Sequence, residues 1–136
     1  MSDYIKTESN KGEGYWRVFE FGEWTTAFLN HSDRFDIANL CEFERHNETD
    51  EVFGLIEGSA YLLTGGNASS PSEDIEITKL EKKNMYNVLK GVWHHIVVSR
   101  DASTYIVECS NTSSENSEKK PISKKAVEYA KSVIKL

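Results

Sequence analysis

Residues 44–58 read ERHNETDEVFGLIEG. This stretch predicts the end of one strand, a polar turn at 47–50, a second strand at 51–56 and a further turn at Gly58. A short hairpin of this kind would return the carboxylate of Glu51 to the side of the His46 imidazole. The stretch therefore brings a histidine and a glutamate together inside a β region.

Strand patterns continue on both sides of this stretch. Polar segments rich in Gly, Asn and Ser separate the strands, and the longest of them covers 65–73. Residues 37–63 read as consecutive strands of a β-meander. The full set of predicted strands is 15–21, 37–46, 51–56, 59–63, 74–80, 85–89, 94–99 and 103–109. About eight short strands at this spacing predict an all-β sandwich or barrel.

Three segments of different character follow one another along the chain. Residues 1–14 are polar and we expect a flexible N-terminus, residues 15–110 form the barrel, and residues 111–136 form a polar loop and a C-terminal helix packed on the barrel. Ser123 is a suitable N-cap for that amphipathic helix, because apolar residues recur after it at helical spacing. Within the barrel, we interpret residues 24–29 as an aromatic-rich segment over one end of the core.

The composition excludes several classes of protein. A net charge of −6, with no Lys/Arg stripe, argues against a nucleic-acid partner. No apolar run approaches the roughly 20 residues of a membrane span, and the polar N-terminus does not resemble a signal peptide, so we expect a cytoplasmic protein with no membrane partner. We interpret Cys41 and Cys109 as reduced core residues, with a zinc site between them as the alternative.

Two of the four histidines lie in predicted strands together with acidic residues. Glu44 and His46 share one face of their strand, and His94 lies on a strand face that we expect to oppose it. With Glu51 added, two imidazoles and up to two carboxylates converge. Such a set suits a divalent transition metal, iron, manganese, nickel or zinc, with an open position for water or substrate. The candidate ligands are therefore His46, Glu51, His94 and Glu44.

Strand alternation also assigns the neighbours of these residues. Phe53 and Ile96 share the inward parity of Glu51 and His94, so they are candidate walls of a cavity, with plain core packing as an equal alternative. His95 must point to the opposite face from His94, and we assign it to the exterior of the barrel.

Residues 44–58 resemble the first sequence motif of the cupin family. That motif is H-x-H, three or four residues, Glu, six residues and Gly. His46 matches its second His, Glu51 its Glu and Gly58 its Gly, all at the right spacing. Glu44 stands where the first His belongs.

Residues 89–94, LKGVWH, resemble the second cupin motif, P-x-G-x-x-H. Gly91 and His94 match it, Leu89 replaces the Pro, and Val98 stands at the position of a later Asn. Together the two motifs cover roughly the middle half of the chain. The resemblance implies a small single-domain cupin, an RmlC-like jelly-roll barrel with one C-terminal helix, of a kind without an assigned activity.

The resemblance implies a metal-binding cupin that acts on or binds a small polar molecule. In an enzyme, the ion held by His46, Glu51 and His94 would act as a Lewis acid or activate water or dioxygen. Glu44 would be a fourth ligand or a general base. The alternatives are a metal-free module for a carboxylated or sugar-like ligand and a purely structural dimer. We expect a homodimer in every case, since cupin barrels commonly pair and exposed sheet edges need covering.

Overall fold

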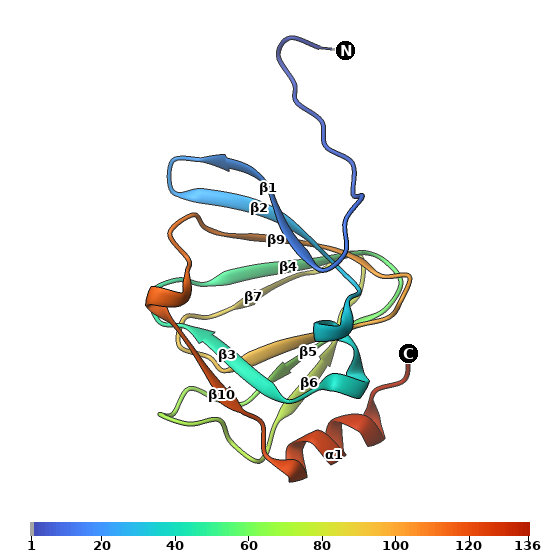
Figure 1. The fold of residues 1–136 in the computed structure, drawn as a ribbon, viewed down its shortest axis with the longest axis vertical. Coiled ribbons are helices and arrows are strands. Elements are labelled where there is room, and N and C mark those ends of the chain that lie inside the picture. Colours follow the sequence, from blue (N-terminus) through green and yellow to red (C-terminus); the bar gives the residue numbers. More distant parts are fainter. Residues whose placement is uncertain (1) are drawn as a thin grey trace.

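The computed structural model describes residues 2–136, which form two antiparallel five-stranded sheets that face each other (Figure 1). The first sheet has the strand order β1-β2-β9-β4-β7 and the second β10-β3-β8-β5-β6. The elements are β1 (Tyr15–Phe21), β2 (Trp24–Asn30), β3 (Glu42–His46), β4 (Glu51–Glu57), β5 (Ala60–Thr64), β6 (Glu76–Lys79), β7 (Met85–Val88), β8 (His94–Val98), β9 (Ser103–Cys109), β10 (Ser117–Pro121) and α1 (Lys124–Val133), with 3-10 helices at Asp33–Phe35, Ile37–Asn39 and Ser114–Asn116. The prediction of an all-β jelly roll followed by one helix is confirmed.

Alternating side chains build the core between the two sheets. Along β9, for example, Thr104, Ile106 and Glu108 are buried, whereas the residues between them are half-buried. The inward apolar residues of both sheets form one cluster that includes Phe53 and Ile96. This arrangement leaves polar inward positions at the strand ends, which is where the candidate site lies.

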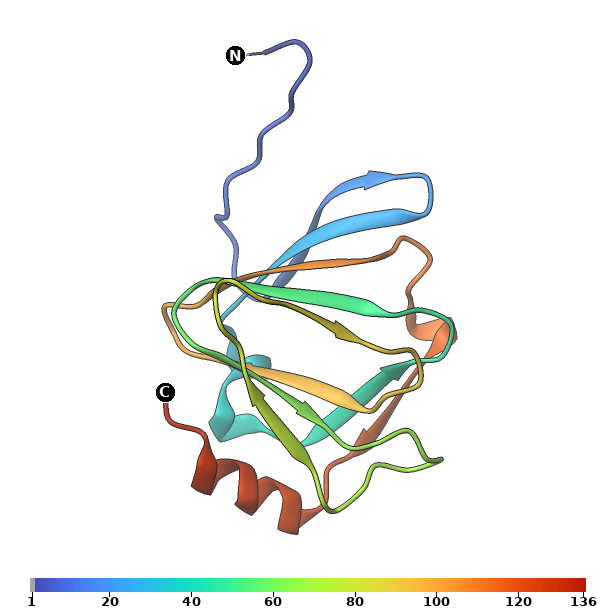
Figure 2. The same ribbon diagram turned by 180° about the vertical axis from the view of Figure 1, so that it is seen from behind.

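A second apolar layer covers the outer face of the second sheet. The helix α1 packs there through Ala126 and Ala130, over the fully buried Trp93, as its place beside that sheet in Figure 2 shows. The Ser123 side chain caps the helix by accepting a hydrogen bond from the Ala126 backbone N–H at 3.1 Å, as predicted. No helix within residues 2–136 is long and apolar enough to cross a membrane.

The predicted β-meander is wrong. β3 and β4 belong to different sheets, and so do β4 and β5, so residues 47–50 cross from one sheet to the other instead of closing a hairpin. β4 pairs with β7 and β9. Turn residues mark where a chain reverses, but the partner of each strand depends on pairing far along the sequence.

Two strands were not predicted. Trp24–Asn30, expected as a cover over the core, is β2 and pairs with both β1 and β9. Ser117–Pro121, expected within a polar loop, is the edge strand β10 and pairs with β3. The strand predicted over 37–46 begins only at Glu42, because Ile37–Asn39 is a 3-10 helix.

Three predicted side-chain positions are also wrong. Cys41 is exposed and Cys109 is half-buried, so neither is a core residue. His95 does lie opposite to His94, but it is only 7% exposed. The 3-10 helix Asp33–Phe35 covers it, with the Phe35 ring stacked at 5.8 Å. A second layer over the sheet therefore turns an exterior position into a buried one.

Candidate functional site

The candidate site lies between the sheets, at strand ends. His46 ends β3, His94 begins β8 and Glu51 begins β4, and the three are 7%, 3% and 5% exposed. β3 and β8 are neighbours in one sheet, where Glu44 lies opposite His94. The prediction that the His46 and His94 faces oppose each other is therefore wrong. They lie side by side, and Glu51 reaches them from the other sheet.

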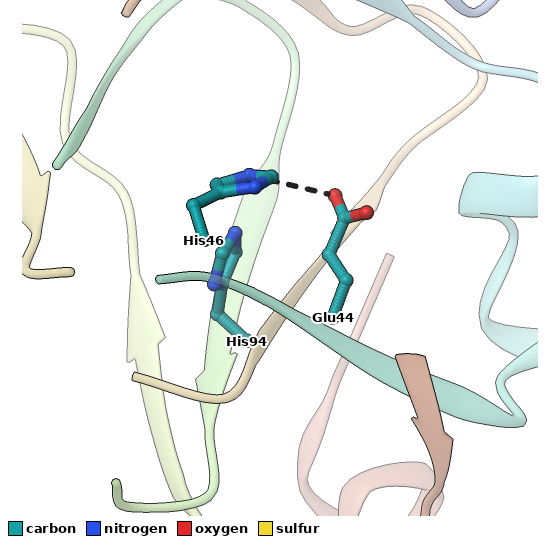
Figure 3. Close-up of side chains that lie close together, drawn as sticks. All are labelled: Glu44, His46 and His94. Atoms are coloured by element: carbon teal, nitrogen blue, oxygen red, sulfur yellow. Dashed lines mark ion pairs between the residues drawn. The ribbon is translucent and has the colours of Figure 1, made fainter. Parts of the chain in front are cut away.

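The two histidines converge on one carboxylate oxygen. Oε1 of Glu51 lies 3.1 Å from Nε2 of His46 and 3.0 Å from Nε2 of His94, and the two imidazole rings are 5.3 Å apart between centroids. Glu44 approaches from the mouth of the site, with Oε1 3.9 Å from Nε2 of His46 (Figure 3). Its second oxygen lies 3.6 Å from the guanidinium of Arg34.

The outer nitrogens of both rings have hydrogen-bond partners. Nδ1 of His94 lies 2.9 Å from the carbonyl oxygen of Val92, and Nδ1 of His46 lies 2.8 Å from Oγ of Ser117. A carbonyl can only accept, so Nδ1 of His94 carries the hydrogen. In its neutral form, His94 therefore presents the lone pair of Nε2 to the lone pair of Oε1 of Glu51, 3.0 Å away. Two lone pairs this close repel unless a positive charge lies between them, which is either a proton on Nε2 or a shared cation.

The electrostatics of these three groups are dominated by burial and by one another. Burial opposes the charged forms of His46 and His94, yet the hydrogen bond and the charge of Glu51 outweigh it, so the pKa of each imidazole is raised. Burial likewise opposes the ionised form of Glu51, but the hydrogen bonds from the two imidazoles and their charges lower its pKa well below the usual range. The cluster therefore favours one anion between two positive groups.

Sequence reasoning missed Glu108, a buried carboxylate of the same site. It lies directly opposite Glu51 in the β4–β9 pair and is 7% exposed. The phenol of Tyr15 donates a hydrogen bond to its Oε1. Burial and then the charge of Glu51 raise the pKa of Glu108. The alternation of Thr104, Ile106 and Glu108 was the available signal, since it places an acid on an inward face.

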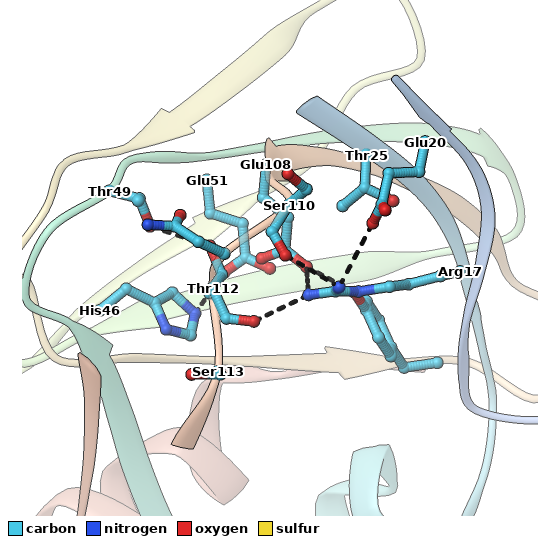
Figure 4. A network of polar contacts seen from close by, with 12 residues as sticks. Arg17, Glu20, Thr25, His46, Thr49, Glu51, Glu108, Ser110, Thr112 and Ser113 are labelled. Atoms are coloured by element: carbon cyan, nitrogen blue, oxygen red, sulfur yellow. Dashed lines mark hydrogen bonds and ion pairs between the residues drawn. The ribbon is translucent and has the colours of Figure 1, made fainter. Parts of the chain in front are cut away.

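Arg17 connects this carboxylate to the loop that follows β9. Its guanidinium lies 3.9 Å from Oε1 of Glu108 and donates hydrogen bonds to the carbonyl oxygens of Ser110 and Thr112 at 3.1 and 2.8 Å (Figure 4). Its Nε donates to the Tyr15 hydroxyl at 3.1 Å. Arg17 therefore links β1, which carries Tyr15, to the loop after β9 on this side of the site.

Two overlapping groups of residues have donor atoms close enough to hold an ion. One group is Glu44, His46 and His94, the other is His46, Glu51 and Glu108, and within each group one donor atom per residue lies within 4.8 Å of the others. All four sequence-predicted ligands belong to one group or the other. His46 belongs to both.

Two cavities share lining residues of this cluster. One, of about 210 Å³, is lined by Glu44, His46 and Glu108, among others, and the other, of about 340 Å³, is lined by residues that include Phe53 and Ile106. Tyr15 and Glu51 line both. Ile96, the other predicted wall residue, packs in the core cluster between the sheets.

Similarity to known proteins is found in structure rather than in sequence. No model of a known protein family matches the chain, and no curated protein sequence matches it. A solved structure of a Streptomyces PAC13 variant with uridine is 10% identical, covers 90% of this chain and 97% of PAC13, and has a TM-score of 0.56. A dTDP sugar isomerase from Desulfovibrio desulfuricans is 12% identical, with coverage of 97% and 81% and a TM-score of 0.53.

A protein described as containing a cupin-2 domain, from Shewanella frigidimarina, is 18% identical over 74% of this chain and 82% of its own, with a TM-score of 0.48. Identities this low bear on the fold alone. The two facing five-stranded sheets and the matches above a TM-score of 0.5 agree with the resemblance carried by residues 44–58 and 89–94. The chain therefore has the jelly-roll fold of the small, RmlC-like cupins.

Proposed function

We propose that this chain is a metal-binding small cupin that holds a divalent transition-metal ion and, beside it, a small polar molecule. The ligands are His46, Glu51 and His94, with Glu44 at the mouth of the site. One observation carries the proposal: the inward nitrogens of two buried imidazoles face the same oxygen of Glu51 at 3.1 and 3.0 Å.

The donor set fits such an ion. Ligands bound at roughly 2.1 Å and at right angles to each other are about 3.0 Å apart, which matches the two distances to Glu51. Val92 holds His94 in the tautomer that offers a lone pair at Nε2, a common arrangement behind metal-binding histidines. Mixed imidazole and carboxylate ligands suit iron, manganese, nickel or zinc, and the bound ion would supply Lewis acidity.

The adjoining cavities support the second half of the proposal. The larger one, about 340 Å³, is lined by Tyr15 and Glu51 and by apolar side chains that include Phe53 and Ile106. A volume of roughly 300–1,000 Å³ with a few polar groups at one end is typical of small-molecule sites. The PAC13 structure with uridine is a precedent for a small polar ligand in a chain of this fold.

A metal-free binding module is the second candidate. A proton on Nε2 of His94 satisfies Glu51 as well as an ion does, and the raised pKa of each imidazole favours that proton. In this case the cluster of His46, Glu51 and His94 would orient a ligand through hydrogen bonds and charge alone. Metal content separates the two candidates.

We also propose that the chain forms a homodimer. Large apolar side chains are exposed on the first sheet: Phe21 is 73% exposed, Trp24 48% and Met85 75%. Exposed apolar groups on a sheet with free edges favour association. The single chain has a mass of 15.5 kDa, and light scattering after size exclusion should give twice that value. A monomer at micromolar concentration would overturn this proposal.

The test of the metal proposal is elemental analysis of protein purified without an affinity tag, before and after reconstitution with each of the four metals. We expect near-stoichiometric metal in the wild type and its loss in a His46→Ala, His94→Ala double variant. His31→Ala is the matched control, because His31 pairs with Asp36 at 2.8 Å and belongs to neither donor group. A wild type that binds none of the four metals would leave the metal-free module.

A further inference from the structure

Glu108 is a buried carboxylate to which the four-residue ligand set gives no role. It lies opposite Glu51 across β4 and β9, and it is held by a chain of contacts: Arg17 donates to the hydroxyl of Tyr15, and Tyr15 donates to Glu108. Buried carboxylates in proteins are paired with a positive charge or bind a metal ion, and the guanidinium of Arg17, the ion-pair partner of Glu108, is 3.9 Å away.

We propose that Glu108 is an additional ligand of the ion, and that the resulting oxygen-rich set selects Mn²⁺ or Fe²⁺ over Zn²⁺. The inference rests on the metal site proposed above. It adds a residue that lies outside both sequence motifs and narrows the four candidate metals to two.

The geometry places Glu108 within reach of an ion beside His46. Donor atoms of His46, Glu51 and Glu108 lie within 4.8 Å of one another, as do those of Glu44, His46 and His94. Opposite ligands of one ion at roughly 2.1 Å are about 4.2 Å apart, so small side-chain movements bring both groups onto one ion. His46, common to both groups, fixes where that ion lies.

The charges of the carboxylates also favour a cation beside Glu108. Imidazoles are neutral when they bind a metal, so Glu44, Glu51 and Glu108 then face each other as three carboxylates. Arg17 lies 3.9 Å from Glu108, but two of its nitrogens donate to the carbonyls of the loop after β9. Like charges directly opposite across strands repel. A divalent cation between Glu51 and Glu108 neutralises both.

The type of ligand then selects the metal. Carboxylate oxygens suit hard ions such as Mn²⁺, imidazole suits zinc, copper, iron and nickel, and two imidazoles with a carboxylate are a known ligand set of Fe²⁺. Zinc in proteins usually takes about four ligands in a tetrahedron. Three carboxylates and two imidazoles exceed that number and leave one position of an octahedron for water or ligand. Mn²⁺ and Fe²⁺ fit this arrangement.

Tyr15 is a positioning residue in this account. Its hydroxyl donates to Oε1 of Glu108 and accepts from Nε of Arg17, so it orients the carboxylate without contacting the ion. Removing the hydroxyl in Tyr15→Phe should weaken Mn²⁺ binding less than removing the carboxylate does, because the charge stays in place.

The test uses the metal ions alone as probes. Dissociation constants are measured for Mn²⁺, from the EPR signal of the free ion, and for Zn²⁺, by competition with a chromophoric chelator. In Glu108→Gln we expect the Mn²⁺ constant to rise at least tenfold and the Zn²⁺ constant to change less than about threefold. Glu57→Gln, exposed at the far end of β4, is the matched control and should change neither.

The outcomes separate this inference from the proposed function. Unchanged Mn²⁺ affinity in Glu108→Gln, or an equal loss of Mn²⁺ and Zn²⁺, would overturn the role of Glu108 while His46→Ala still abolishes binding. A wild type that binds no ion would overturn the metal site itself. If Glu108→Gln does not fold, Glu108→Asp retains the charge but retracts the oxygens, and it must weaken Mn²⁺ binding in the same direction for the inference to stand.

Discussion

His94 and His95 are consecutive residues of β8, buried to nearly the same extent at 3% and 7% exposure, yet they lie in opposite environments. His94 faces the space between the sheets and meets Glu51 at 3.0 Å. His95 faces the outer layer, where its Nε2 lies 3.2 Å from the carbonyl oxygen of Arg34 and its ring stacks on Phe35.

The partner, and not the depth of burial, decides what each imidazole can do. Burial opposes a charge on both rings. Glu51 reverses this for His94, whose pKa is raised. Around His95, burial and then the positive charge of Arg34 lower the pKa to about 4. A neutral, stacked imidazole is a structural residue, whereas one beside a buried carboxylate can take a proton or a metal.

The largest expected effect comes from removing the charge that distinguishes the two sites. Glu51→Gln leaves two buried imidazoles without their anion, so the free energy of unfolding of the metal-free protein should fall by about 3–5 kcal/mol. Urea unfolding at pH 6 with a chelator present measures it, and Glu57→Gln serves as the control. An unchanged midpoint would show that Glu51 does not hold the histidines in a charged form.

The next effect concerns His95 and acid. The pKa of His95 is about 4 in the folded chain and about 6.5 in the unfolded chain. Between pH 6.5 and pH 4, the unfolded chain therefore binds one more proton than the folded chain does. Stability from this residue is present above pH 6.5 and falls by up to about 3 kcal/mol as the pH drops to 4. The free energy of unfolding of His95→Phe, relative to that of the wild type, should therefore rise by about 3 kcal/mol between pH 7 and pH 4. Urea unfolding at the two pH values measures it. A constant difference between the two proteins would contradict the buried neutral state.

A smaller effect tests the outer contact of His46. The corresponding contact of His94 is a backbone carbonyl, but that of His46 is the Ser117 hydroxyl at 2.8 Å, which mutation can remove. Ser117→Ala should weaken metal binding about tenfold without preventing it, as calorimetric titration would measure. Ser114→Ala, in the neighbouring 3-10 helix, should have no effect, and equal losses in the two variants would assign the change to the loop rather than to His46.

The sequence allowed much of the fold to be predicted, because local signals specify strands well. The short apolar runs of β4 and β8, the alternation of β9 and the capped helix α1 all follow from residues close together in the chain. β10 was missed for the same reason. Its sequence, SEKKP, has no apolar alternation, and it is a strand only because it pairs with β3 at the edge of the sheet.

The site was predictable where a motif gives the spacing, and not beyond that. His46, Glu51 and His94 meet as the spacing of residues 44–58 and 89–94 suggests. Glu108 was missed because its place depends on pairing with Glu51, which is distant in sequence. His95 was placed outside because alternation specifies a face of the sheet but not whether another layer covers that face.

A calorimetric titration of Mn²⁺ into wild type, His94→Ala and His95→Ala, each first freed of metal with a chelator, compares the two imidazoles directly. We predict near-stoichiometric binding in the wild type and in His95→Ala, and a loss of at least a hundredfold in affinity in His94→Ala. Equal binding by the two variants would contradict the account, since it would mean that the partner of each imidazole does not decide its function.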